Sequence, residues 1–440
     1  MIKRYSNGDK YDGAVDYKGD FEGFGEYTWA NGNRYIGDWH IGFMHGHGTM
    51  YWANGNTYTG DWSFDKRTGY GTATYASGEK YTGEFLDNNF HGKGTLTDYD
   101  GTTYEGNFSN GKCCGKMIIR WPDGEKYEGA IVNGEKTGYG KYFFSDGDRY
   151  EGEFRNNKRT GKGKFFWTNG NYYEGDFIDD KLSGKGKFVW PSGAVYEGDF
   201  VDDKRTGKGK YNCPDGKIYE GGFVNGVCSG RGRLTWPSGS YCEGNFVNDE
   251  LHGYGIMVWS DGDKYVGAFD NGRRTGKGQF TWANGDCYEG DFIDGSRTGK
   301  GKLTWPSGDC YEGDFVDGKR TGKGKYTWAS GTVYEGDFVD NKLTGKGTTC
   351  NRADGVFEEG DFVDGQLMNG TAIIRLDEFT DRALILCHSD GEMYLKYLQF
   401  TNNDRYFGEW KNFIPNGSGL LQKADGTELQ GTFVNGEFIG

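Results

Sequence analysis

The sequence YEGDFVDGKRTGKGKYTWASGTV, from Tyr311 to Val333, decides the fold because it is one copy of a unit that repeats along the chain. The next copy begins 23 residues later at Tyr334 and reads YEGDFVDNKLTGKG. A glycine recurs at the same place in the aligned units, from Gly13 to Gly431. A regular period of this size predicts one supersecondary unit copied along an array, rather than several globular domains.

The first part of the unit predicts a β-strand. Tyr311, Gly313 and Phe315 alternate with two acidic residues, which is the period of a strand with one aromatic and one acidic face. Residues 316–321 are rich in Asp, Gly, Lys and Arg and are predicted to form a loop. Residues 322–328 are predicted to be the second strand, so each unit is a β-hairpin.

Glycine has two expected roles in this hairpin. At Gly331, after Ala-Ser, it supplies the positive φ of the turn that leads to the next unit. Within the strands, it leaves space for a large ring on the neighbouring strand to lie flat over the backbone. On the opposite face, Glu and Asp are expected to pair with Lys across strands.

The repeat predicts an all-β fold: an elongated single-domain array of about 18–19 β-hairpin repeats that forms a twisted antiparallel sheet. One array is expected over residues 1–440, with an N-terminal half repeat at 1–10, regular repeats at 11–380 and C-terminal repeats at 406–440. Residues 381–405 are read as a degenerate repeat in which Asn403 takes the place of the turn glycine. Its aliphatic residues indicate either a local variation of the core or a docking patch.

Charge and composition exclude several classes of protein. The net charge of −14 argues against a nucleic-acid partner, since such domains are usually basic. The N-terminus lacks the apolar stretch of a signal peptide, and no run of apolar residues is long enough to span a membrane. Nine cysteines without framework spacing indicate free thiols in the cytosol, so the protein is expected to be cytoplasmic and not secreted.

No candidate for catalysis or metal binding is unique in the sequence. His45 and His47 have a spacing that could hold a metal, but they occupy loop positions of the repeat. Glu174 and Asp176 resemble the paired carboxylates of a hydrolase, yet the pair recurs in many units, whereas catalysis needs one singular constellation. We therefore predict no catalytic residues, no metal and no cofactor.

The units resemble the MORN family, the membrane occupation and recognition nexus repeats. The resemblance covers nearly the whole chain and rests on YEGEF at Tyr150 and YEGDF at Tyr173, Tyr196 and Tyr288, each followed by TGKGK or SGKGK. It implies hairpin arrays with a groove, and scaffolding roles at cytoskeletal structures, cilia and membrane-linked complexes, often as homodimers. Lipid kinase or methyltransferase domains accompany the repeats in some relatives, but no stretch of this chain is left to encode one. Bacterial choline-binding repeats also combine Gly with Trp and Tyr, but the G-K-G-K element argues against them.

Two surfaces are candidates for binding. If a groove leaves part of it exposed, an aromatic face would bind a protein partner through Tyr173, Phe177, Trp190, Tyr196, Phe200, Trp236, Trp282, Trp305 and Trp328. The alternative for these rings is ordinary core packing. Basic loops would bind anionic lipid through Lys158, Arg159, Lys204, Arg205, Arg273, Arg274, Lys319 and Arg320, although neighbouring Asp residues argue for neutralised loops.

These surfaces lead to two hypotheses. The first is a non-enzymatic scaffold that organises protein partners, in the cytoplasm at the cytoskeleton, a cilium or a membrane-associated structure. The second is a peripheral membrane adaptor that binds phosphoinositides through the basic loops. Self-association, as a homodimer or edge to edge, is a further expectation, because the edges of an open sheet carry unpaired backbone groups.

Overall fold

A computed structural model describes residues 1–351, 355–374, 382–387, 393–400, 402–411 and 414–440, and every regular element in these residues is a β-strand. The all-β prediction is therefore confirmed. The chain divides into two compact units. Unit 1 is Met1–Gly216 with Gly222–Gly226, and unit 2 is Lys217–Gly221 with Val227–Gly440. The single continuous array over 1–440 stays a prediction.

The strands of unit 1 are β1 (Ile2–Arg4), β2 (Lys10–Val15), β3 (Phe21–Thr28), β4 (Arg34–His40), β5 (Phe43–Tyr51), β6 (Thr57–Ser63), β7 (Lys66–Thr74), β8 (Lys80–Leu86), β9 (Asn89–Thr97), β10 (Thr103–Ser109), β11 (Lys112–Arg120), β12 (Lys126–Val132), β13 (Glu135–Phe143), β14 (Arg149–Arg155), β15 (Lys158–Phe166), β16 (Tyr172–Ile178), β17 (Lys181–Val189), β18 (Val195–Val201) and β19 (Lys204–Asn212). Strand β20 (Ile218–Val224) has residues in both units.

The strands of unit 2 are β21 (Val227–Thr235), β22 (Tyr241–Val247), β23 (Glu250–Val258), β24 (Lys264–Asp270), β25 (Arg273–Thr281), β26 (Cys287–Ile293), β27 (Ser296–Thr304), β28 (Cys310–Val316), β29 (Lys319–Thr327), β30 (Val333–Val339), β31 (Lys342–Asn351), β32 (Val356–Val363), β33 (Gln366–Ile374), β34 (Arg382–Cys387), β35 (Met393–Gln399), β36 (Arg405–Lys411), β37 (Ile414–Gln422), β38 (Glu428–Val434) and β39 (Glu437–Phe438).

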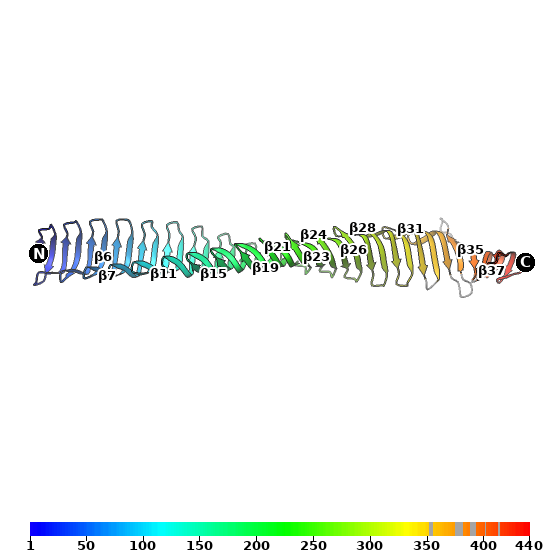
Figure 1. Ribbon diagram of the computed structural model, residues 1–440, viewed down its shortest axis with the longest axis horizontal. Helices are drawn as coiled ribbons and strands as arrows, with labels where there is room; N and C mark the ends of the chain where they lie inside the picture. The colour runs from blue at the N-terminus through cyan, green and yellow to red at the C-terminus, as the bar shows by residue number, and fades with distance from the viewer. Residues whose placement is uncertain (352–354, 375–381, 388–392, 401, 412–413) are drawn as a thin grey trace. The chain divides into compact units, whose positions relative to one another are not determined.

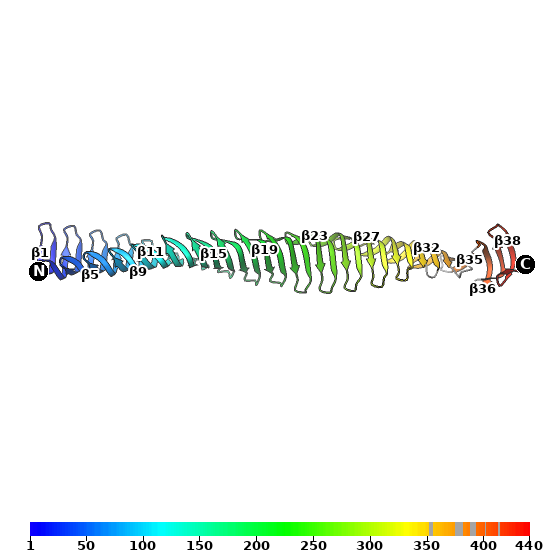
Figure 2. The same ribbon diagram turned by 60° about the horizontal axis from the view of Figure 1, so that its bottom comes forward.

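Consecutive strands pair antiparallel within each unit, from β1 to β19 in unit 1 and from β21 to β39 in unit 2. Figures 1 and 2 show these neighbours side by side. The repeat therefore folds as the predicted antiparallel meander of hairpins.

The predicted loop at 316–321 is wrong, because the hairpin closes much more tightly. Val316 pairs with Lys319, so the turn is only Asp317 and Gly318, with φ of 48° and 79°. Positive φ at both central residues is the requirement of a type I′ turn, which Asp-Gly and Asn-Gly satisfy. Lys319–Thr321 therefore belong to strand β29.

A β-bulge accommodates two residues of β29 that have no partner on β28. Gly313 pairs with Gly324, whereas Asp314 pairs with Thr321, so Gly322 and Lys323 are extra residues on β29. Gly322 has a φ of 58°, and the carboxylate of Asp314 accepts the backbone N–H of Lys323 at 3.2 Å. The acidic residue of the repeat thus stabilises the bulge, which bends the strand.

The predicted turn between units is confirmed. Gly331 has a φ of 87° and donates its N–H to the carbonyl of Trp328 at 2.8 Å. In the degenerate repeat, Asn403 has a φ of 69° and donates in the same way to Phe400 at 2.9 Å. Residues 375–381 and 388–392 and the side chains of β34 lie outside the described residues, so the choice between core variation and docking patch stays open.

Tyrosine rings lie over paired glycines and form the core. Tyr311 is fully buried, and a Cβ on either Gly313 or Gly324 would overlap its ring. Its hydroxyl donates to the carbonyl of Asp314 at 3.1 Å, which holds the ring in place. The expected stacking of rings over glycine therefore occurs, and the ring comes from the same strand as Gly313.

Candidate functional site

A groove in unit 2 lies over a row of glycines. The glycine repeat positions pair across strands β25 to β33 and form a glycine ladder: Gly278, Gly290, Gly301, Gly313, Gly324, Gly336, Gly347, Gly360 and Gly370. A side chain at these positions would point to the tyrosine face, so no side chain stands over this row on the charged face. The groove above it has a volume of about 1670 Å³.

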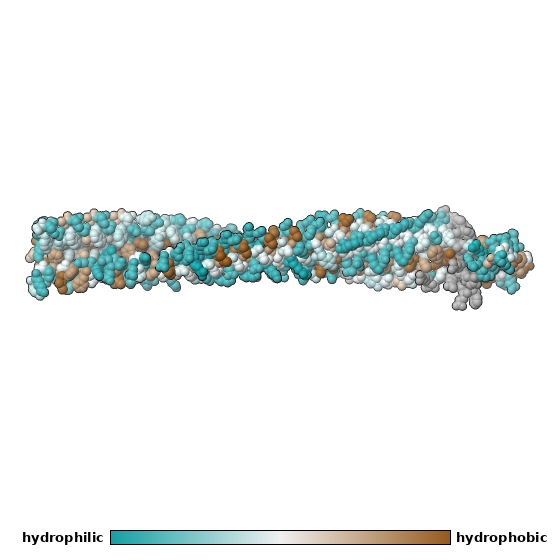
Figure 3. Space-filling model, in the orientation of Figure 1, coloured by the Kyte–Doolittle hydropathy of each residue, from teal (hydrophilic) through white to brown (hydrophobic). Residues whose placement is uncertain are grey.

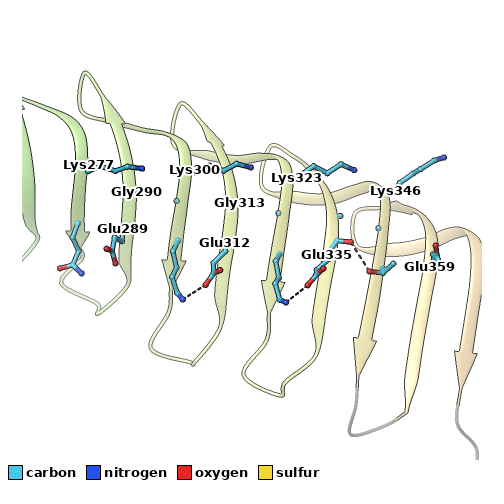
Figure 4. A pocket seen from close by; sticks show the side chains of 18 of the residues that line it. Lys277, Glu289, Gly290, Lys300, Glu312, Gly313, Lys323, Glu335, Lys346 and Glu359 are labelled. Carbon is cyan, nitrogen blue, oxygen red and sulfur yellow. Dashed lines mark hydrogen bonds and ion pairs between the residues drawn. The ribbon is translucent and has the colours of Figure 1, made fainter.

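One side of the groove is a row of lysines, which we call the lysine wall: Lys277, Lys300, Lys323 and Lys346 (Figure 4). Lys300 Nζ lies 2.7 Å from Asp314, and its side chain is 70% exposed against 32% for the carboxylate. Since the same carboxylate also binds the bulge N–H, it lies below the ammonium group. The lysine wall therefore presents positive charge at its outer edge.

The other side carries both signs of charge, and we call it the glutamate wall: Glu289, Lys302, Glu312, Lys325, Glu335 and Glu359. Its lysines pair with glutamates on adjacent strands, at 2.5 Å for Lys302–Glu312 and 2.6 Å for Lys325–Glu335 (Figure 4). The hydrogen bond from Lys302 lowers the pKa of the Glu312 carboxyl. The wall has more glutamates than lysines because Gln279 and Thr348 stand where lysines would complete the alternation.

The groove depends on backbone glycine and on charge rather than on apolar side chains. On the face that Figure 3 draws, hydrophilic residues predominate and hydrophobic residues appear as separate spots. Sequence reasoning placed the charged pairs but missed the groove. The signal in the sequence was the glycine of Y-x-G and the second glycine of G-x-G. The register of neighbouring strands pairs these two glycines, and the pairs line up in one row.

Most of the aromatic residues predicted to bind a partner are part of the core. Tyr173, Phe177, Tyr196 and Phe200 are at most 2% exposed. Tyr173 contacts Phe177 of its own repeat and Phe200 of the next edge to face, with ring centroids 5.2 Å and 5.1 Å apart. Their exposure to a partner would require the core to open.

The tryptophans of the same prediction are half-buried, at the turns between repeats: Trp190, Trp236, Trp282, Trp305 and Trp328. They are therefore the part of the aromatic face that reaches solvent. Partner binding through this face stays a prediction, limited to these five side chains.

The arginines of the basic loops connect neighbouring repeats. Arg159, Arg205 and Arg320 donate to backbone carbonyls of the following turn at 2.8, 2.5 and 2.9 Å. Arg274 lies over four aromatic rings, the closest being Phe280 at 5.1 Å, and burial lowers its pKa. These guanidinium groups are packed against protein, which leaves them poorly placed to reach lipid headgroups.

The other basic residues of these loops are exposed. Lys158, Arg273 and Lys319 lie 3.5, 3.4 and 2.9 Å from an Asp of the next turn. Lys204 is exposed at the start of β19. The predicted alternative of neutralised loops thus describes the three paired residues, while lipid binding stays a prediction.

Histidines and thiols contribute no further site in the described residues. His47 Nδ1 lies 3.2 Å from Asp61, and no group of three metal-ligating side chains occurs in the described part of the chain. The eight described cysteines form no disulfide with one another. None of the described residues belongs to a helix that could cross a membrane.

Comparison with known proteins shows what the chain is similar to. A family model of the MORN repeat matches fifteen consecutive segments over residues 16–350 and a further segment at 406–428. A search of curated proteins found no match.

Solved structures show only a distant likeness. The TCP domain of SAS-4 from Drosophila melanogaster is 14% identical over 40% of this chain and 90% of that chain, with a TM-score of 0.25. The TCP10 domain of CPAP from Danio rerio is 11% identical over 57% of this chain and 93% of that chain, with a TM-score of 0.20. These scores are too low to support an argument about function.

Proposed function

Because the chain belongs to the MORN-repeat family, we propose that it is a non-enzymatic scaffold that holds protein partners in the cytoplasm, at cytoskeletal, ciliary or membrane-associated structures. The observation that carries the proposal is the groove of unit 2, which offers nearly the same side chains at each repeat from Lys277 to Lys346. A surface that repeats suits an extended partner. Catalysis needs a singular arrangement of groups instead.

Phosphoinositide binding is the competing proposal, and its support is narrower. It would use the exposed basic residues of the loops, such as Lys204 and Lys319. Since Lys319 already pairs with Asp340 at 2.9 Å, anionic lipid would have to compete with that carboxylate. Such an exposed ion pair contributes about 0–1 kcal/mol, so it would weaken lipid binding at Lys319 without preventing it.

Two assays on the full chain separate these proposals. Affinity capture with cell extract should retain proteins that the Lys300→Ala/Lys323→Ala variant loses. The matched Lys181→Ala/Lys342→Ala variant should retain them, because it removes exposed Lys–Asp ion pairs of 2.9 Å and 3.0 Å that lie outside the groove. Flotation with phosphoinositide liposomes, at low and high salt, should leave the protein unbound. Salt-sensitive flotation that Lys204→Glu/Lys319→Glu abolishes, with no captured protein, would overturn the scaffold proposal.

A further inference from the structure

The side chains that line the groove of unit 2 repeat at a regular distance along it. That distance restricts the conformation of a polypeptide that binds in the groove. Each repeat adds two strands, and neighbouring strands are about 4.8 Å apart, so equivalent side chains recur about every 9.6 Å along the groove. The lysine wall and the glutamate wall share this period because both belong to the same strands. Only a ligand with a matching period makes the same contact at successive repeats.

Polyproline II is the regular conformation that matches. Its three-residue turn rises about 9.3 Å, so it falls out of step by only about 1 Å over four repeats. A β-strand repeats its side-chain direction every ~6.8 Å and an α-helix turns every ~5.4 Å. Neither of these presents the same side chain to successive repeats.

The three sides of the groove then assign a residue class to each position of the turn. The glycine ladder has no side chains, so its position takes a small or compact residue such as proline. Three of the four ammonium groups of the lysine wall pair with an Asp at 2.6–2.8 Å, so an acidic residue that faces the wall would share each ammonium group with that carboxylate. The glutamate wall has an excess of carboxylates, with Glu359 standing opposite Thr348 rather than a lysine, so the third position is basic.

We propose that the groove of unit 2 binds a polyproline II segment of a protein partner with a three-residue charge period: compact on the glycine ladder, acidic at the lysine wall and basic at the glutamate wall. The proposal rests on the proposed function, that the chain binds protein partners, and specifies the chemistry of the partner.

Strands β5 to β9 of unit 1 lack this pattern of charge. There the row that corresponds to the glutamate wall contains five threonines on adjacent strands: Thr49, Thr59, Thr72, Thr82 and Thr95. The row of paired glycines is also interrupted in unit 1, since Met117 pairs with Gly106 and Gly129. The charge pattern recurs in β15 to β18, where Lys164–Glu174 and Lys187–Glu197 lie 3.1 Å and 2.7 Å apart, so the groove itself, rather than charge alone, places the proposal in unit 2.

Fluorescence anisotropy of labelled (Pro-Glu-Lys)n peptides with the full chain tests the period. From two to four triplets, each added triplet should tighten binding roughly twofold to fivefold, the worth of an exposed ion pair. Beyond five triplets the peptide is longer than the four-lysine wall, and the affinity should level off. A peptide of the same composition without the three-residue period should bind at least about tenfold more weakly.

Substitutions in the groove test its position. Lys300→Ala/Lys323→Ala should weaken binding roughly fivefold or more, while Lys181→Ala/Lys342→Ala, which removes two exposed Lys–Asp ion pairs outside the groove, should change it less than twofold. Circular dichroism checks that the variants are folded, and Lys300→Arg/Lys323→Arg, which keeps both charges, should restore binding. On the unmodified chain, raising the salt from 50 to 500 mM should also weaken binding.

Three outcomes would overturn the proposal: equal affinity for the permuted peptide, affinity independent of length, or equal loss from the Lys181→Ala/Lys342→Ala variant. If these occur while affinity capture still retains proteins that depend on Lys300 and Lys323, only the polyproline II proposal fails. If no protein is captured either, the scaffold proposal fails with it.

Discussion

At the scale of the residue, most of the paired strand glycines of this repeat are needed because a large apolar side chain, usually a tyrosine ring, lies over them. Where Cys242 takes the place of the tyrosine, the side chain of Leu251 lies over Gly244 instead. A Cβ added to Gly244 would be only 2.7 Å from Leu251 Cδ1. Where a ladder glycine is replaced by Met117, its sulfur lies over Gly106. The space over the glycine is filled in each case, so the requirement is for a large apolar side chain as much as for tyrosine.

We expect Gly313→Ala to lower the free energy of unfolding by roughly 2–4 kcal/mol, because the new Cβ overlaps the ring and hydroxyl of Tyr311. Gly331→Ala is the matched control. It has open space around it but a φ of 87°, so only backbone strain of about 1–2 kcal/mol is expected. Urea unfolding measures both, and equal losses would contradict the role of the ring.

Arginine has a structural role at the same scale that its charge does not reveal. Arg320 lies 5.6 Å from the ring centres of Trp305 and Tyr311 and donates to the carbonyl of Asn341. A guanidinium group combines a planar face for stacking with several donors, whereas an ammonium group lacks that plane. Each arginine of this kind therefore links one repeat to the next.

At the scale of the element, the hairpin depends on an acidic clamp at its bulge. Asp337 binds Lys323 Nζ at 2.6 Å and the backbone N–H of Lys346 at 3.1 Å. Both contacts lower the pKa of the carboxyl, with the hydrogen bond from Lys323 as the larger cause. Asp199 is held in the same way by Lys185, whose hydrogen bond lowers its pKa.

We expect these carboxylates to make stability fall in acid. Since the folded pKa is below the ordinary value of 3.8, the contribution is complete above that pH and is lost as the pH falls through the folded pKa. The urea midpoint should therefore be nearly constant from pH 7 to pH 5 and decrease below about pH 4. Asp199→Asn/Asp337→Asn should lower the midpoint at pH 7 and reduce the decrease in acid; an unchanged acid decrease would contradict the assignment.

At the scale of the whole molecule, each described strand pairs mainly with its sequence neighbours, so the array tolerates the loss of a complete repeat. Deletion of residues 311–333 joins Cys310 to Tyr334 and brings β30 to the position of β28 with the glycine ladder in register. We expect a folded protein whose free energy of unfolding falls by roughly 1–3 kcal/mol, the share of one repeat.

A shorter deletion is the control for this prediction. Removing residues 311–321 deletes β28 with its turn, so two consecutive strands would run in the same direction without a crossover to connect them. Circular dichroism and urea unfolding should show substantial loss of structure for this variant only. Equal behaviour of the two deletions would contradict an array built from complete hairpins.

The sequence by itself determined the repeat, the all-β class, the family and the glycine of the turn between repeats. These follow from local information: a period of two within YEGDF, Gly at position 331, and Asn403 as the residue that best replaces it. Local pattern was insufficient at 316–321, where the polar composition is typical of a loop. Only Asp317 and Gly318 form a turn there, and the other residues pair in β28 and β29, with a bulge that restores the register.

Only the tertiary structure decided which surfaces are available for binding. Tyr173 and Phe177 belong to the aromatic face that was predicted to bind a partner, yet contacts with the neighbouring repeats bury them. Arg205 belongs to a basic loop in the sequence, yet its guanidinium packs against rings and a carbonyl of the following turn. The groove needs the register of glycines from nine strands. Such a row forms through hydrogen bonds between strands, whereas a sequence pattern describes only the order of residues along one strand.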